Sequence, residues 1–184
     1  MIRNGFRRVI AFVIPLLLFG CVFFKTRYEE IPPNLLPLAD PVTLSDSTWN
    51  WRVKSLGGPE ETLAVWNGEP LFLNFWGTWC QPCVVEMPGM QRMYDSLRTD
   101  GVRFLFVSNE REAPVQQFIE KTGYTLPIYV AVEDIPPQLL TGLFPTTFLI
   151  NRKGQIVFRQ VGSAKWDDPS VLKAVRSFAL SDQN

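Results

Sequence analysis

Two cysteines three residues apart stand where a buried strand gives way to a helix, and this junction limits the possible folds more than any other feature. Residues 71–76 (LFLNFW) are almost continuously apolar, which is typical of a strand buried on both faces. Cys80 and Cys83 follow after a short turn. A helix is expected over residues 82–97, bent at Pro88 because a proline ring removes one backbone hydrogen bond. The pair therefore lies on a strand–helix junction of an α/β domain.

The position of the pair at the start of a helix predicts redox chemistry. Unpaired backbone N–H groups and the positive end of the helix dipole stabilise a thiolate at Cys80. Cys80 is therefore the expected nucleophile, and Cys83, shielded inside the helix, resolves the mixed disulfide that Cys80 forms with a substrate. The alternatives are half of a zinc site, for which the other ligands are missing, and an inert disulfide, which would restrict the unfolded chain little because its loop is so short.

The chain of 184 residues has the length of one ordinary globular domain, and it contains no histidine. This absence excludes serine–histidine–aspartate hydrolases, cysteine–histidine proteases and histidine-ligated zinc or copper sites. Its three cysteines are too few for a four-cysteine zinc or iron–sulfur site within one chain. We therefore expect no metal and no cofactor, and proton handling must fall to a carboxylate.

The charges are unevenly distributed along the chain. Basic and acidic residues number 18 each, but five basic residues precede Glu29, which is the first acidic one. The body of the protein is therefore acidic and its leader is basic. An acidic body without a basic cluster gives no reason to expect nucleic acid as a partner.

Residues 1–27 are expected to target the protein to a membrane. Residues 9–24 are apolar throughout, and a helix of this length spans roughly 24 Å, short of the roughly 30 Å hydrocarbon core. Three interpretations stay open: a retained signal anchor, a lipoprotein signal in which Cys21 is acylated, and a cleaved export signal. Cys21 follows a glycine, as lipoprotein processing requires, although Phe19 is bulkier than the usual small residue. All three place the domain outside the cytoplasm, in the cell envelope, because the basic start stays inside.

Downstream of the leader, residues 28–41 are rich in proline and predict an extended linker to a domain of residues 42–184. The patterns beyond the junction already described predict a preliminary hairpin from residues 49–53 and 62–65, a strand at 102–107, a helix at 114–121, an extended segment at 126–132, a short helix at 136–141 capped by Asp134, a hairpin of residues 146–150 and 155–161, and a final helix from about 168 to 180.

The residues around the cysteine pair resemble the thioredoxin superfamily. Residues 75–83 (FWGTWCQPC), followed by Glu86, Met87 and Pro88, are similar to the membrane-tethered, extracytoplasmic TlpA/ResA-like thiol-disulfide oxidoreductases. The resemblance covers roughly residues 42–180. It implies a thioredoxin-like fold, in which helices flank a central mixed sheet and a β-hairpin is added at the N-terminal side.

The resemblance also suggests how protons move. Ordinary thioredoxins carry a buried aspartate where this chain has Asn74, and an amide cannot take up a proton. The TlpA/ResA-like group is similar to this chain in having asparagine there and a glutamate three residues after the second cysteine, which corresponds to Glu86. A partly buried carboxyl near the sulfurs would have a raised pKa and could accept the proton of Cys83. A glutamate facing solvent is the alternative.

A second matching motif, residues 142–150 (GLFPTTFLI), corresponds to the loop where the family places a cis-proline facing the cysteines. Pro145 would expose neighbouring backbone groups so that an extended substrate segment pairs beside Cys80. Phe144 is bulkier than the residue usual at its position and is expected to narrow the choice of partner. Trp79 either forms part of the substrate-facing rim or packs internally, and Trp76 is expected in the core.

Pro82, the second residue between the cysteines, indicates the direction of electron flow. Strongly oxidising relatives carry histidine there, whereas Pro82 resembles reducing thioredoxins. We therefore expect a reductase of disulfides in exported proteins, such as the haem-binding cysteines of apocytochrome c, with electrons from a membrane thiol donor. An oxidant or isomerase of envelope disulfides and a non-catalytic binding module stay open. A peroxiredoxin-type peroxidase and a copper-delivery protein are excluded because their cysteine motifs are absent.

Overall fold

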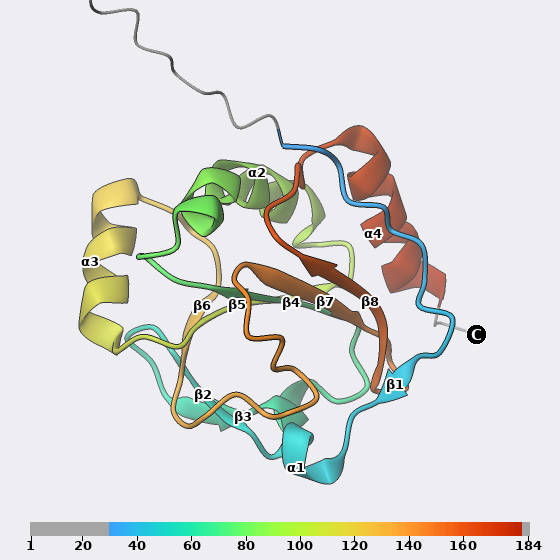
Figure 1. Ribbon diagram of the computed structural model, residues 1–184, viewed down its shortest axis with the longest axis horizontal. Coiled ribbons are helices and arrows are strands. Elements are labelled where there is room, and N and C mark those ends of the chain that lie inside the picture. Colours follow the sequence, from blue (N-terminus) through green and yellow to red (C-terminus); the bar gives the residue numbers. More distant parts are fainter. Residues whose placement is uncertain (1–29, 182–184) are drawn as a thin grey trace, which may run out of the picture.

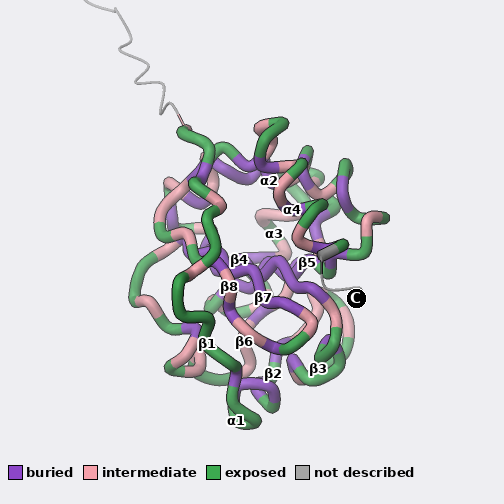
Figure 2. Tube along the Cα trace, turned by 90° about the vertical axis from the view of Figure 1, so that its right-hand side faces the viewer, coloured by how far each residue is buried: buried purple, intermediate pink, exposed green. Residues whose placement is uncertain are grey.

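The strand expected at residues 71–76 is β4 (Leu71–Trp76), and it lies in the middle of an eight-stranded mixed sheet. The computed structural model describes residues 30–181, in which the strand order is β1-β8-β7-β4-β5-β6-β2-β3 (Figure 1). β4 pairs parallel with β5 (Arg103–Ser108) and antiparallel with β7 (Thr146–Ile150). Every residue of β4 is buried, and Figure 2 shows that the central strands are largely buried. The predicted thioredoxin-like α/β architecture is confirmed.

The remaining elements are β1 (Val42–Thr43), α1 (Asp46–Trp49), β2 (Arg52–Ser55), β3 (Glu60–Thr62), the 3-10 helix η1 (Leu63–Trp66), α2 (Gln81–Leu97), α3 (Glu112–Thr122), β6 (Ile128–Ala131), β8 (Gln155–Val161) and α4 (Pro169–Ser181). The predicted N-terminal hairpin is present as β2 and β3, and β2 joins the sheet by pairing with β6. The predicted helices over residues 82–97, 114–121 and 168–180 are found as α2, α3 and α4.

Side chains of β4 alternate between two hydrophobic cores because successive residues of a strand point to opposite faces. Phe72 and Trp76 face one core, which α2 and α4 cover. Leu73 and Phe75 face a second core, which is closed by the N-terminal segment around α1 and η1 and by the loop between β6 and β7. The carboxyl end of β4 is thus fixed from both sides where it leads into the cysteine pair.

The proline-rich segment is extended over its described part, and it lies along the domain (Figure 1). The carbonyl of Ile31 accepts a hydrogen bond from the N–H of Lys165 at 3.0 Å, and the N–H of Leu38 donates to the carbonyl of Val157 at 2.7 Å. Leu35 packs against the core beneath α4. The segment is therefore bound to the domain by hydrogen bonds before it enters the sheet at β1.

Two local predictions on the N-terminal side of the sheet are wrong. Trp49 belongs to the short helix α1, whose N-cap Ser45 accepts a hydrogen bond from the N–H of Thr48. The returning strand ends at Thr62, and η1 follows it. In both places the chain turns so that Trp49 and Leu63 enter the second core, and this packing overrides the local alternation.

The short helix expected at residues 136–141 is also absent, and Asp134 caps nothing. The segment makes only a turn, in which the N–H of Leu139 donates to the carbonyl of Pro136 at 2.9 Å. Pro137 disfavours helical geometry at the residue before it. The loop is held instead by Gln138, whose side-chain oxygen accepts hydrogen bonds from Thr48 and Ser45.

The predicted leader of residues 1–27, with Cys21, lies outside the described residues. Within residues 30–181, no helix is long and apolar enough to cross a membrane.

Candidate active site

Cys80 and Cys83 form a disulfide at the N-terminus of α2, with their Cα atoms 5.2 Å apart. Cys80 is the N-cap residue, and its Sγ accepts a hydrogen bond from the N–H of Cys83 at 3.3 Å. The sulfur therefore occupies the position where unpaired helix N–H groups stabilise negative charge. Cys80 is 4% exposed and Cys83 is fully buried. Both cysteines are therefore shielded from solvent in the disulfide form.

Glu110 holds the turn that leads into Cys80. β4 and β5 run parallel with Trp76 opposite Ser108, so the turns that follow them meet at the same edge of the sheet. The carboxylate of Glu110 accepts hydrogen bonds from the N–H of Thr78 at 2.6 Å and from its hydroxyl at 2.7 Å. Ser108 donates a further hydrogen bond to this carboxylate at 3.1 Å. The backbone before Cys80 is thereby tied to the neighbouring strand.

Glu86 lies beneath the cysteine pair, one helical turn after Cys83, and it is 2% exposed. Its Oε2 accepts hydrogen bonds from Trp166 Nε1 at 2.9 Å and from the N–H of Ala164 at 3.1 Å. Its Oε1 accepts one from Asn74 Nδ2 at 3.3 Å. The structure therefore contradicts the solvent-facing alternative for Glu86.

Burial raises the pKa of Glu86 from its ordinary value to about 8. Desolvation is the dominant cause because it penalises the ionised carboxylate. The hydrogen bonds from Trp166, Ala164 and Asn74 act in the opposite direction and lower the pKa, since they favour the charged form. The carboxyl is therefore protonated near neutral pH, yet it has donors in place that support it once it is ionised.

Asn74 connects this carboxyl to β7. Asn74 lies opposite Thr147 in the pairing of β4 with β7, and its Nδ2 also donates to Thr147 Oγ1 at 2.9 Å. Both residues are buried. The amide thus acts as a spacer that orients Glu86 and cannot itself exchange a proton.

The peptide bond between Phe144 and Pro145 is cis, as the resemblance implied. β7 begins directly after Pro145, and Phe75 of β4 lies opposite Thr146. Pro145 therefore lies beside the end of β4 that leads to Cys80. The structure places the cis-proline and the cysteine pair at the same edge of the sheet.

The two tryptophans of the motif have different environments. Trp79 is 61% exposed, and its ring makes an edge contact with Phe144 at a centroid distance of 5.5 Å. Trp76 is buried in the core, as expected, and packs against Phe118. Of the two, only Trp79 is positioned to meet a substrate.

Sequence reasoning missed Trp166 and Glu110. Trp166 lies 80 residues from Glu86 in a segment without regular structure, and no local pattern marks it. Glu110 could have been found, because it follows a buried strand whose parallel neighbour leads to the cysteines. Polar residues at the carboxyl ends of adjacent parallel strands commonly meet at a site.

Comparison with known proteins places these features in a family. Residues 52–175 match the family described as Redoxin. The chain is 35% identical over 155 residues to the thiol-disulfide oxidoreductase ResA of Geobacillus thermodenitrificans, which covers 82% of this chain and 84% of that protein. It is 30% identical over 158 residues to ResA of Bacillus anthracis, covering 85% of this chain and 88% of the relative.

Solved structures agree with this assignment. StoA from Bacillus subtilis is 26% identical, with a TM-score of 0.53, and the match covers 70% of this chain and 94% of StoA. A thioredoxin family thiol:disulfide interchange protein from Chlorobium tepidum has the same fold at 24% identity, with a TM-score of 0.59 and coverage of 76% and 99%.

Proposed function

Since the chain belongs to the Redoxin family and is a ResA-like protein disulfide oxidoreductase of the thioredoxin superfamily, we propose that it reduces disulfides of exported proteins in the cell envelope. The buried carboxyl of Glu86 behind the cysteine pair supports this function most strongly. It supplies a proton acceptor, with a pKa of about 8, to a chain that has no histidine. It lies one helical turn from Cys83, the cysteine that must lose a proton.

The reaction begins with both cysteines reduced. The Cys80 thiolate attacks one sulfur of the substrate disulfide, and the other sulfur leaves as a thiolate that takes up a proton from solvent. Cys83 then gives its proton to Glu86 and attacks Cys80 Sγ, which releases the second substrate sulfur as a thiolate that takes up a proton from solvent. The substrate gains two electrons, and the protein is left with the disulfide seen in the structure.

Glu86 serves the second step in this mechanism. Its carboxyl must be ionised to accept the proton of Cys83, and the donors Trp166, Ala164 and Asn74 stabilise that ionised form inside the core. The proton then returns to solvent before the next cycle. A pKa near 8 lies close to that of an ordinary thiol, so the transfer is nearly balanced in free energy.

The residues between the cysteines support the reducing direction. Gln81 and Pro82 carry no positive charge, so nothing between the cysteines specially stabilises the Cys80 thiolate and thus the reduced form. A dithiol of this kind gives up electrons readily. An oxidant or isomerase is the second candidate, and it would be favoured by a reduction potential near the roughly −120 mV of strong oxidants rather than the roughly −270 mV of thioredoxin.

The location in the envelope is inferred from residues 1–27, whose basic start and apolar run resemble an anchor or an export signal. The expected partners are exported proteins with disulfides, such as apocytochrome c, and a membrane thiol that re-reduces the pair. The membrane is reached through the N-terminal segment.

The assignment is tested with the full-length chain in a mild detergent, by thiol-dependent reduction of insulin. Cys80→Ser is expected to lower the rate to the uncatalysed background, whereas Cys21→Ser, which removes the third cysteine, should retain the wild-type rate. Equal activity in Cys80→Ser and wild type would contradict the assignment.

A second variant tests the order of the steps and the binding-module alternative. Cys83→Ala removes the resolving thiol, so mixed disulfides between Cys80 and native partners should accumulate in cells. They are detected as species that disappear on reduction before electrophoresis. Recovery of none, together with no insulin reduction by the wild type, would favour a non-catalytic binding module.

A further inference from the structure

The loop between β6 and β7 encloses an apolar recess on the face that carries the cis-proline. The recess has a volume of about 220 Å³. Its apolar lining consists of Phe75, Ile135, Leu139, Leu140, Leu143 and Phe144. Small-molecule sites usually begin at roughly 300 Å³, so a recess of this size suits one side chain better than a cofactor.

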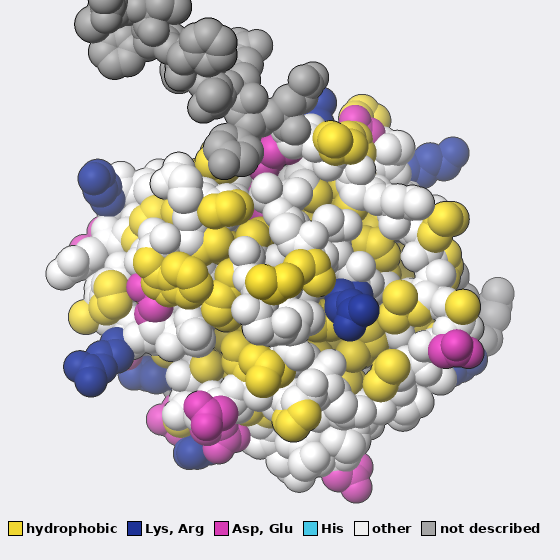
Figure 3. Space-filling view, in the orientation of Figure 1, with side chains coloured by type: hydrophobic (Ala, Val, Ile, Leu, Met, Phe, Trp, Pro, Cys, Tyr) yellow, Lys and Arg dark blue, Asp and Glu magenta, His cyan; other side chains and the backbone are white. Residues whose placement is uncertain are grey.

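The recess continues the active site. Phe144 lines it and also contacts the ring of Trp79, the residue before Cys80. Leu140 and Leu143 are 58% and 60% exposed, close to the value of Trp79. Apolar side chains reach the surface at several places on the side of the molecule that Figure 3 shows. Clustered exposed apolar residues of this kind mark interaction surfaces.

A second hollow, with acidic residues in its lining, adjoins the recess. It has a volume of about 490 Å³ and shares Asn109, Ile135 and Leu140 with the apolar recess. Its lining also includes Glu133 and Asp134, which are absent from the lining of the apolar recess. The two hollows therefore form one groove, in which the apolar part lies nearer to Phe144 and the acidic part lies farther away.

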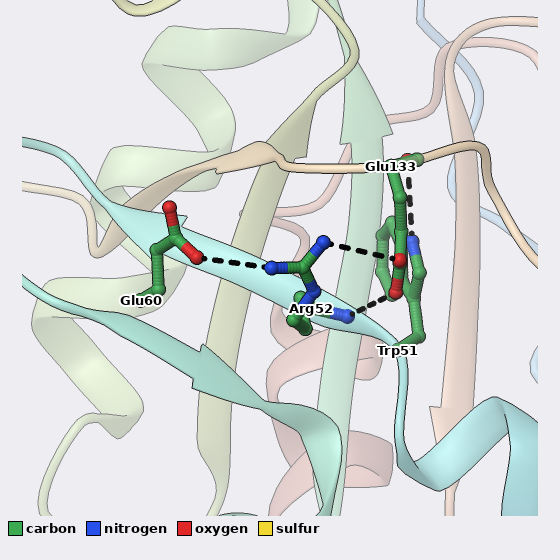
Figure 4. Close-up of polar contacts among 4 residues, drawn as sticks. All are labelled: Trp51, Arg52, Glu60 and Glu133. Carbon is green, nitrogen blue, oxygen red and sulfur yellow. Dashed lines mark hydrogen bonds and ion pairs between the residues drawn. The ribbon is translucent and has the colours of Figure 1, made fainter.

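Charge in the acidic part is negative. The carboxylate of Glu133 is held by Arg52, which donates from its backbone N–H at 3.0 Å and from Nη2 at 3.5 Å (Figure 4). Arg52 also contacts Glu60 at 3.4 Å, so one cation serves two carboxylates. Asp134 is exposed and makes no hydrogen bond or ion pair with any other residue in the range 30–181. Its charge is free to meet a partner.

We propose that this groove binds the polypeptide segment next to the reacting disulfide of the substrate protein, and that it selects an apolar side chain followed, farther from the cysteine, by lysine or arginine. The inference rests on the proposed function, since the occupant is the substrate of Cys80. The order of the two side chains follows from the groove, which runs from Phe144 past Leu140 to Asp134.

Charge favours this occupant over a second copy of the chain. A symmetric dimer through the groove would bring the acidic parts of both copies into the same interface, because a two-fold contact uses the same patch twice. Like charges at such an interface oppose association. A basic substrate segment has the opposite sign and meets no such penalty.

Peptide disulfides test the groove. Each peptide carries one cysteine in a disulfide with thionitrobenzoate, which is coloured once it is released. Two to four residues from that cysteine the peptide has leucine or alanine, and beyond that position it has lysine or glutamate. The two variable positions are placed on the N-terminal side of the cysteine in one set of peptides and on the C-terminal side in another, so that both directions of the bound peptide are tested. The reduced full-length chain in a mild detergent is mixed with each peptide, and kcat/KM is measured. The disulfide of thionitrobenzoate with itself serves as a small substrate that has no peptide segment to place in the groove.

Wild type should prefer the leucine peptide to the alanine peptide by about tenfold, the lower end of what a lost apolar contact costs. Leu140→Ser should reduce this ratio by about fivefold, whereas Leu180→Ser, a control at an equally exposed leucine on α4, should leave it unchanged. The small disulfide should react at the same rate with all three proteins.

The charge part is tested in the same way. Asp134→Asn should reduce the preference for lysine over glutamate by about two- to fivefold, the range of an exposed ion pair, and added salt should diminish it. Asp40→Asn, an exposed aspartate on the N-terminal segment, is the matched control. Asp134→Lys should reverse the preference.

A wild type that reduces the small disulfide but treats all the peptides alike overturns the groove assignment and leaves the proposed function standing. Dimerisation in sedimentation experiments that Leu140→Ser abolishes, with no peptide preference, would also overturn it in favour of a second copy. Failure to reduce any disulfide would remove the proposed function itself.

Discussion

Glu86, in the helix that begins at the cysteine pair, and Asp134, in the loop between β6 and β7, are two carboxylates with contrasting surroundings. Glu86 is buried and accepts hydrogen bonds from three donors, and its pKa is raised to about 8. Asp134 is exposed and has no hydrogen bond or ion pair to another residue in the described part of the chain. Burial therefore brings the pKa of the first group close to that of a thiol, and exposure leaves the second accessible to a partner.

The same contrast extends to the regions around these residues. The pocket of Asn74, Glu86 and Trp166 is closed by α2 and by the segment before α4, and it acts on the cysteines whatever the substrate. The groove of the β6–β7 loop is open to solvent and contacts only what approaches Cys80. Changes behind the cysteines should therefore alter rate and pH dependence for every substrate. Changes in the groove should alter KM for some substrates and not for others.

The largest effect is expected in the pH dependence of stability. The unfolded chain releases the proton of Glu86 near its ordinary pKa, whereas the folded chain holds it up to about pH 8. Between these values rising pH removes the proton from the unfolded state only, so stability falls with pH and levels off above 8. The loss is on the order of 3 to 5 kcal/mol. Denaturant unfolding of the oxidised protein at pH 5 and at pH 8.5 measures it.

Glu86→Gln removes this titration and should lose much less stability over the same range. Glu120→Gln, a change at an exposed residue of α3, should follow the wild type. Parallel stability curves for wild type and Glu86→Gln would mean that the carboxyl is not held protonated in the fold.

The next effect concerns the rate. Glu86→Gln should slow the resolution of the mixed disulfide by about 100-fold, the lower end of what general-base catalysis contributes. In the wild type this rate should rise with pH and level off above the pKa of about 8, whereas the variant should lack this limb. Single-turnover release of a peptide thiol measures the step. An unchanged rate for the variant at every pH would show that Cys83 loses its proton to solvent and not to Glu86.

Much of the buried region could be predicted from the sequence, because its determinants are local. The apolar run of residues 71–76, the cysteine pair and the helix after it predicted β4 and α2, and the resemblance to the TlpA/ResA-like group pointed to Glu86, which the structure shows to be buried. The donors to Glu86 could not be predicted, since Trp166 and Ala164 arrive from the far end of the chain. No local pattern records a contact over such a separation.

The exposed region was predicted poorly for the same physical reason. A helix over residues 136–141 matched the local pattern, but Pro137 opposes it and Gln138 ties the segment to Ser45 and Thr48 instead. The shape of the groove depends on this clasp between two distant segments. Phe144 and Pro145 were found because they belong to a motif, whereas Leu140 and Asp134 belong to none.

Glu110 holds the turn before Cys80 and belongs neither to the pocket around Glu86 nor to the lining of the groove. Glu110→Ala leaves the N–H of Thr78 without its acceptor and loosens the turn before Cys80, so kcat/KM should fall by about tenfold, equivalent to one charge-assisted hydrogen bond. Glu110→Gln keeps one acceptor and should recover part of the loss. Thr78→Val removes only the hydroxyl and should cost less than Glu110→Ala. Insulin and a small disulfide should be affected equally, and a loss confined to insulin would place Glu110 with the groove.

The smallest effect is expected where the two regions meet, at the contact between Trp79 and Phe144. An exposed edge contact of two aromatic rings contributes about 0.5 to 1.5 kcal/mol. Trp79→Ala and Phe144→Ala should each raise KM for peptide disulfides by about two- to fivefold and leave kcat and the small disulfide unchanged. If the rings act as one surface, the double variant should lose less than the product of the two single effects. A full product would show that Trp79 and Phe144 contact the substrate independently, and a fall in kcat would show that their contact orients Cys80.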